Sequence, residues 1–177
     1  MRLLPFAFAM AVFGATPAPA QTPPASACNA PEFRQFDFWQ GEWNVTSQGQ
    51  PAGHSRIEAI LGGCAILENW RGAKGNEGKS FNTYNVSAGH WEQYWVDGSG
   101  TPLHLRGGLV DGRMVLSGQQ PKANPQTGLT QRERITWTPN ADGSVRQLWE
   151  TSDDDGKTWG VSFDGLYRPV TAPSPST

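Results

Sequence analysis

A long series of short strand patterns, separated by turn dipeptides, constrains the fold of this chain more than any other feature. The turn signals are Gly62-Gly63, Asp111-Gly112, Asp142-Gly143 and Asp155-Gly156, and such pairs favour tight hairpins. Between the turns, apolar and polar residues alternate with the period of two that is typical of strands. The pattern predicts about ten strands, at residues 39–45, 55–61, 64–71, 79–85, 90–97, 103–107, 113–118, 130–138, 144–152 and 159–168.

Strands at this spacing, with no amphipathic helical stretch among them, predict an all-β protein. Consecutive hairpins favour an antiparallel up-and-down meander. A long meander leaves exposed edge strands unless it closes on itself. We therefore expect an up-and-down β-barrel of about ten strands, which is wide enough to enclose a cavity.

The first strand follows a cluster of aromatic residues. Phe33 and Phe36 stand three positions apart within residues 31–36, which suits one or two turns of helix. From residue 39 to 45, apolar and small residues alternate with polar ones, beginning with Trp39, Gly41 and Trp43. This alternation predicts a strand with one buried face. We expect a short N-terminal helical turn that plugs one end of the barrel, with Trp43 at its floor.

The N-terminus has the features of a secretory signal peptide. Arg2 precedes an uncharged apolar run from Leu3 to Ala15, and small residues follow at Ala18 and Ala20. The run is shorter than the ~20 residues of a membrane-spanning helix. We expect a signal peptide at 1–20, a flexible leader at 21–31, a β-barrel domain at 32–170 and a disordered tail at 171–177. The protein would be exported, periplasmic or secreted, with no transmembrane segment after cleavage. An uncleaved anchor and a lipoprotein beginning at Cys28 are the alternatives.

The net charge limits the classes of partner, and the two cysteines indicate the redox compartment. The formal net charge of −2 argues against nucleic acid and anionic membrane surfaces as partners. The chain has 2 cysteines, Cys28 and Cys64. In an exported protein such a pair predicts one disulfide, and two unpaired thiols are the alternative.

One small pattern recurs along the strands: an acid or amide stands two residues before a Trp. Because alternate residues share a face, each such pair would point to the same side of its strand. If these faces line the barrel, the interior has Trp walls and a few polar groups, as small-molecule sites do. Glu133 has the same parity as Trp137 on a later strand. The candidate ligand-binding residues are therefore Glu68, Trp70, Gln93, Trp95, Glu133, Gln147 and Trp149.

Two other functions are compatible with these residues. Trp at alternate positions also fills the core of a small barrel, so a structural or protein-interaction module with a filled core is one alternative. An enzyme with Glu68 or Glu133 as an interior general acid or base is the other. We favour a binding protein of unspecified oligomeric state that takes a small apolar or aromatic molecule.

Recognisable catalytic and metal-binding motifs are missing from the sequence. It contains no G-x-S-x-G elbow and no phosphate-binding glycine loop. Its histidines, His54, His90 and His104, lack metal-ligand spacing. We predict no catalytic residue, metal site or cofactor. Residues 152–159 fit the S-x-D-x-G-x-T-W pattern known as the Asp box, and we interpret this single copy as a hairpin staple.

Three stretches carry a family resemblance. Gly41-Glu42-Trp43, after a short helical lead-in, resembles the G-x-W signature of lipocalins and related calycins. Together with residues 60–64 and 163–168, the stretch 36–43 looks like an uncharacterised family of exported bacterial proteins with a calycin-like barrel. The resemblance implies structural roles for Trp39, Gly41 and Trp43, and a basic residue, Arg168, that packs over the Trp. It implies the fold and the binding of a small apolar ligand.

Overall fold

The computed structural model describes residues 28–123, 125 and 128–170. The expected signal peptide at 1–20, most of the leader at 21–31 and the tail at 171–177 lie outside the described residues. Within the described part, no helix is long and apolar enough to cross a membrane. The elements are η1 (Pro31–Arg34), η2 (Asp37–Trp39), β1 (Gly41–Ser47), β2 (Gln50–Ile60), η3 (Leu61–Gly63), β3 (Ala65–Gly72), β4 (Glu77–Asn85), β5 (His90–Asp97), β6 (Leu103–Val110), β7 (Arg113–Ala123), β8 (Thr130–Pro139), β9 (Val145–Ser152) and β10 (Gly160–Pro169).

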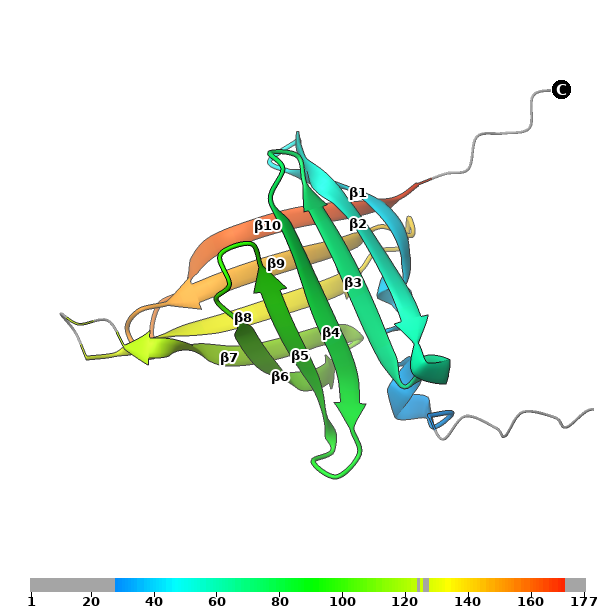
Figure 1. Ribbon diagram of the computed structural model, residues 1–177, viewed down its shortest axis with the longest axis horizontal. Helices are drawn as coiled ribbons and strands as arrows, with labels where there is room; N and C mark the ends of the chain where they lie inside the picture. The colour runs from blue at the N-terminus through cyan, green and yellow to red at the C-terminus, as the bar shows by residue number, and fades with distance from the viewer. Residues whose placement is uncertain (1–27, 124, 126–127, 171–177) are drawn as a thin grey trace, which may run out of the picture.

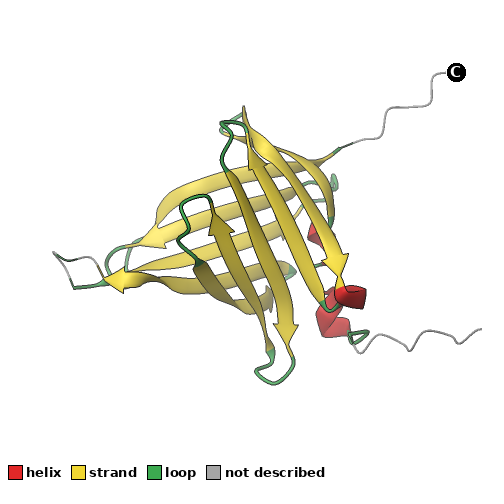
Figure 2. Cartoon of the chain, in the orientation of Figure 1, coloured by secondary structure: helices red, strands yellow, loops and turns green. Residues whose placement is uncertain are grey.

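The strands form a closed antiparallel barrel, which confirms the predicted all-β, up-and-down architecture. Each strand pairs with the next in sequence, and β1 closes the barrel against β10 through pairs such as Val45 with Tyr167. Figure 1 shows β2, β3, β4 and β5 crossing in front of β7, β8, β9 and β10. Figure 2 shows that strands form nearly all of the wall, with the short helical segments gathered at one end. Closure removes the unpaired edges that a long meander would expose.

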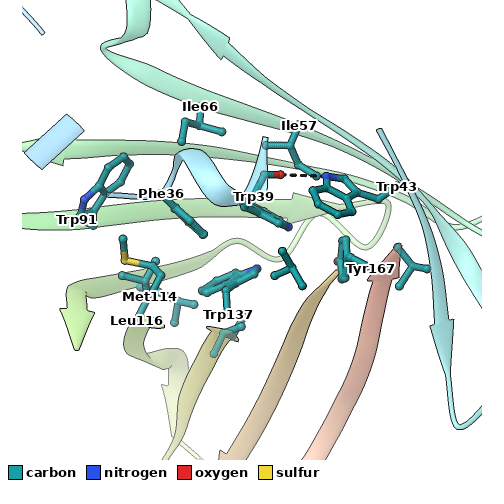
Figure 3. Close-up of a cluster of buried hydrophobic side chains, with 14 of the residues drawn as sticks. Phe36, Trp39, Trp43, Ile57, Ile66, Trp91, Met114, Leu116, Trp137 and Tyr167 are labelled. Atoms are coloured by element: carbon teal, nitrogen blue, oxygen red, sulfur yellow. Dashed lines mark hydrogen bonds between the residues drawn. The ribbon is translucent and has the colours of Figure 1, made fainter. Parts of the chain in front are cut away.

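A plug of aromatic side chains fills that end of the barrel (Figure 3). Phe36 stacks on Trp39 with ring centroids 4.9 Å apart, and it makes T-shaped contacts with Trp91 and Trp137, with centroids 5.7 Å and 5.2 Å away. The indole N–H of Trp43 donates to the carbonyl oxygen of Trp39 over 3.0 Å. These contacts join the helical lead-in to strands from opposite sides of the barrel. The expected helical plug is therefore confirmed.

The lead-in is longer than the sequence pattern predicted. Trp39 belongs to the short helix η2, and the strand begins only at Gly41. Gly41 has φ of +136°, a conformation that side-chain-bearing residues rarely adopt. Glycine therefore lets the chain turn from the helical segment into β1. The indole ring of Trp43 lies beside Gly41, where an added Cβ would be 3.6 Å from the indole nitrogen.

The predicted pairing of Cys28 with Cys64 is present. The disulfide joins the segment before η1 to the residue directly before β3, across a sequence separation of 36. Arg34 adds a second tie, because its guanidinium donates to the carbonyl oxygen of Gly63 over 2.6 Å. The expected two-residue hairpin at Gly62-Gly63 is wrong: residues 61–64 form the connection, and Leu61, with φ of 53°, turns with the two glycines.

Arg168 does not pack over Trp43. Its side chain is exposed, whereas the adjacent Tyr167 is 2% exposed and contacts the rings of Trp43 and Trp39 at 6.3 Å. Alternate residues of β10 point to opposite faces, so Arg168, which pairs with Asn44, points outward, and Tyr167, which pairs with Val45, points inward. The role expected for Arg168 from the resemblance is thus filled by an aromatic ring.

The Asp box forms the staple that its sequence predicts between β9 and β10. The Asp154 carboxylate accepts hydrogen bonds from the Thr158 hydroxyl (2.6 Å), the Thr158 amide (2.8 Å) and the Ser152 hydroxyl (2.8 Å). These donors favour the ionised form and lower the pKa of Asp154 to about 2. Ser152 also accepts from the Gly156 amide over 2.8 Å. The turn is therefore held by its own side chains.

Candidate ligand-binding cavity

The end of the barrel opposite the plug contains a cavity of about 300 Å³. Its walls come from residues of β2, β3, β5, β6, β8, β9 and β10, and from the connection before β4. The aromatic lining consists of Trp70, Trp95, Trp137, Trp149, Phe163 and Tyr167. The polar lining consists of Glu68, Asn76, Gln93, Asp97, Gln147 and Ser162. Mostly apolar walls with a few polar groups are typical of small-molecule pockets.

Two of the indole rings lie against glycines on neighbouring strands. An added Cβ at Gly53 of β2 would stand 2.7 Å from the ring of Trp70, closer than real Cβ atoms come. A Cβ at Gly78 of β4 would overlap the ring of Trp95. Glycine inside a strand often marks such a close approach. Gly53 and Gly78 therefore set how deeply Trp70 and Trp95 recede into the wall, and so the width of the cavity.

A hydrogen-bond network converges on the carboxylate of Glu68, which is 4% exposed. Ser55 of β2 donates to one carboxylate oxygen over 3.0 Å, and Ser80 of β4 donates to the other over 2.9 Å. Behind Ser80, the amide of Asn82 donates to the Ser80 hydroxyl over 2.9 Å, and Gln93 donates to Asn82 over 2.7 Å. The hydrogen bonds thus run in series from Gln93 through Asn82 and Ser80 to Glu68. The network spans β2 to β5 and fixes the carboxylate at the cavity wall.

Burial raises the pKa of Glu68 from 4.5 to about 7, and the hydroxyls of Ser80 and Ser55 offset part of this rise. The charged form loses its hydration in the barrel, and two hydroxyl donors replace only part of what water supplies. Burial likewise raises the pKa of Tyr167, and the nearby Glu68 charge adds to it. Tyr167 therefore remains neutral, while Glu68 changes its charge near neutral pH.

This titration predicts that the protein becomes less stable as pH rises. Between pH 4.5 and about 7 the folded protein holds a proton on Glu68 that the unfolded chain releases. The free energy of unfolding should fall through this window by about 3 kcal/mol from Glu68 alone. Glu68→Gln should abolish most of that fall. Urea denaturation at several pH values measures it, with the exposed Glu42→Gln as the matched control. An unchanged pH dependence in Glu68→Gln would contradict the assignment.

Glu133 does not line the cavity. Although it is 1% exposed and points into the barrel, it accepts hydrogen bonds from the Trp149 indole (2.5 Å) and from the Gln120 amide (2.7 Å). The hydrogen bond from the Trp149 indole to Glu133 thus fixes the orientation of the Trp149 ring, which lines the cavity. Strand parity correctly predicted that Glu133 is interior, but the covering side chains keep it away from the cavity.

Each of the two glutamines of the cavity uses one amide atom in a hydrogen bond to a neighbouring side chain. Gln93 uses its nitrogen on Asn82, and Gln147 uses its oxygen to accept from the Tyr167 hydroxyl. Among the described residues, the Gln93 carbonyl oxygen and the Gln147 amide nitrogen have no hydrogen-bond partner. The cavity therefore offers a free acceptor and a free donor. The buried indole N–H of Trp137, at the inner end, also lacks a partner within the described part of the chain.

The structure brings together six of the seven candidate residues at one cavity, namely Glu68, Trp70, Gln93, Trp95, Gln147 and Trp149. The sequence reasoning missed the serines, Asn82, Tyr167 and the two glycines. Ser55, Ser80 and Asn82 could have been found by extending the parity of β2 and β4. Gly53 and Gly78 could have been found as glycines within strands.

Among the residues that the structure describes, no three His, Cys, Asp or Glu side chains converge as metal ligands. No protein-family model matches the chain, and no curated protein is significantly similar to it.

Proposed function

We propose that this protein binds a small, partly apolar molecule inside its barrel. The observation that carries the proposal is the cavity of about 300 Å³, bounded by Trp70, Trp95 and Trp149. Ligand pockets of about 300–1,000 Å³ with apolar walls and sparse polar groups are typical of small-molecule sites. The free amide atoms of Gln93 and Gln147 would orient the ligand between the rings.

The size of the cavity weighs against a filled core. A water molecule occupies about 30 Å³ of liquid, so a space of about 300 Å³ exceeds what a few ordered waters fill.

Titration of intrinsic Trp fluorescence against a panel of hydrophobic and aromatic molecules tests the proposal. We expect saturable changes with at least one panel member. Trp95→Ala should weaken binding about tenfold or more, because one wall is lost. Trp159→Ala provides the control, since Trp159 lies on the Asp box and packs on Arg134 at 4.1 Å, outside the cavity. No response from any panel member would count heavily against ligand binding.

An enzyme is the second candidate, favoured by one observation. Glu68 lines the cavity and has a pKa raised to about 7, which suits a general acid or base at neutral pH. Glu133 does not share this setting, because Trp149 and Gln120 cover it. If an activity is found, Glu68→Gln should abolish it. An activity that Glu68→Gln leaves unchanged would remove this candidate.

We also propose that the barrel is of the calycin type and is exported. The G-x-W stretch at Gly41–Trp43 begins β1 of a closed meander barrel, as in calycins. The Cys28–Cys64 disulfide supports an oxidising compartment. Fractionation of producing cells, with mass spectrometry of the mature N-terminus, tests the export.

A further inference from the structure

The ionisable acidic residues of the cavity lining have no basic counterpart in it. Two carboxylates, Glu68 and Asp97, line it, and its lining includes no Lys, Arg or His side chain. The basic residues nearest in sequence to Trp70 and Ser80, Arg71 and Lys79, are exposed on the outside of the barrel. A ligand in the cavity would therefore meet negative charge without a compensating cation.

The faces of the aromatic rings also favour a positively charged ligand. Six aromatic rings line the cavity, and the face of an aromatic ring carries negative electrostatic potential that attracts cations. Among these rings, Trp70 contacts Phe163 at 6.2 Å and Tyr167 at 6.5 Å between centroids. Trp70 lies on β3 with Glu68, whereas Tyr167 lies on β10, which β1 and β2 separate from β3. Aromatic cages with a nearby carboxylate are suited to quaternary ammonium groups.

We propose that the ligand is a small organic cation, an amine or quaternary ammonium compound, whose charged group sits between the Glu68 carboxylate and the indole walls. The inference rests on the proposed binding function and names the chemical class of its ligand. Free Gln93 and Gln147 amide atoms would bind a neutral polar group of the same molecule.

Binding of a cation would be coupled to release of the Glu68 proton. The groups that face Glu68 are the Ser55 and Ser80 hydroxyls and Tyr167, and Asp97 shares the cavity. The pKa of Tyr167 is raised by burial, and hydrogen bonds from Ser99 lower the pKa of Asp97. Between pH 5.5 and 8 Glu68 is therefore the lining group that changes charge. A cation should bind more tightly at the higher pH.

Two probes of nearly equal shape separate charge from size: phenyltrimethylammonium and tert-butylbenzene. Neither titrates between pH 5.5 and 8, so the pH dependence reports the protein. We expect wild-type protein at pH 8 to bind the cation about tenfold or more tightly than the hydrocarbon. This advantage should shrink at pH 5.5. Glu68→Gln should weaken the cation alone by about tenfold, and Glu42→Gln should change neither probe.

Wild-type protein alone provides the pH comparison, so the test does not depend on the folding of a variant. Equal or tighter binding of tert-butylbenzene at pH 8 would overturn the cation assignment and leave the proposed binding function standing. Binding of neither probe at millimolar concentration would also overturn it, and the broader fluorescence titration would then decide the binding function separately.

Discussion

Phe36→Ala is expected to lower the free energy of unfolding by about 3–5 kcal/mol, because it removes a large side chain from a site with little room to collapse. Phe36 is 0% exposed and contacts four rings, those of Phe38, Trp39, Trp91 and Trp137. Its loss would leave a hole at the centre of the plug and remove aromatic contacts from two sides of the barrel.

Phe81→Ala is the matched control for this change. Phe81 lies on β4 but is 42% exposed, so the same substitution removes an outward ring and leaves the plug intact. Surface substitutions usually change stability by about 0.5 kcal/mol or less. Urea denaturation of both variants measures the difference. A similar loss in the two would show that the plug does not organise the barrel.

Replacing both cysteines, Cys28→Ser with Cys64→Ser, should cost about 4 kcal/mol of stability, since the disulfide closes a loop of sequence separation 36. The bond constrains residues 28–64 in the unfolded chain and holds the plug against β3 in the folded one, so its loss raises the entropy of the unfolded chain and weakens the plug. The expected result is a lower denaturant midpoint with an unchanged β-sheet circular dichroism spectrum.

Reduced wild-type protein serves as the control for the double substitution. It lacks the bond but keeps both cysteine side chains, so it should unfold at nearly the same urea concentration as the variant. If oxidised and reduced wild-type protein unfold at the same midpoint, the disulfide contributes nothing to stability, and the predicted loss is wrong.

The barrel could be predicted because its signals are local. Turn dipeptides and alternation place each strand, and the edge problem of a long meander requires closure. The inward parity of Glu68, Gln93 and Gln147 follows from the same alternation. These features need only the neighbouring residues in the sequence.

The remaining features depend on contacts between strands. The sequence did not show that Tyr167, not Arg168, contacts Trp43, because this depends on the register of β10 with β1. It did not show that Trp149 and Gln120 cover Glu133, since parity gives the side of a strand but not the neighbour. The raised pKa of Glu68 likewise depends on burial within the barrel.

The location of a bound ligand tests the central claim most directly. The chain has 8 tryptophans, and each indole N–H gives its own signal in a ¹⁵N-correlated NMR spectrum. For every molecule that changes Trp fluorescence, we expect the signals of Trp70, Trp95 and Trp149 to shift, while that of Trp159 stays in place. Shifts confined to Trp159, or the absence of shifts at the three cavity tryptophans, would contradict ligand binding inside the barrel.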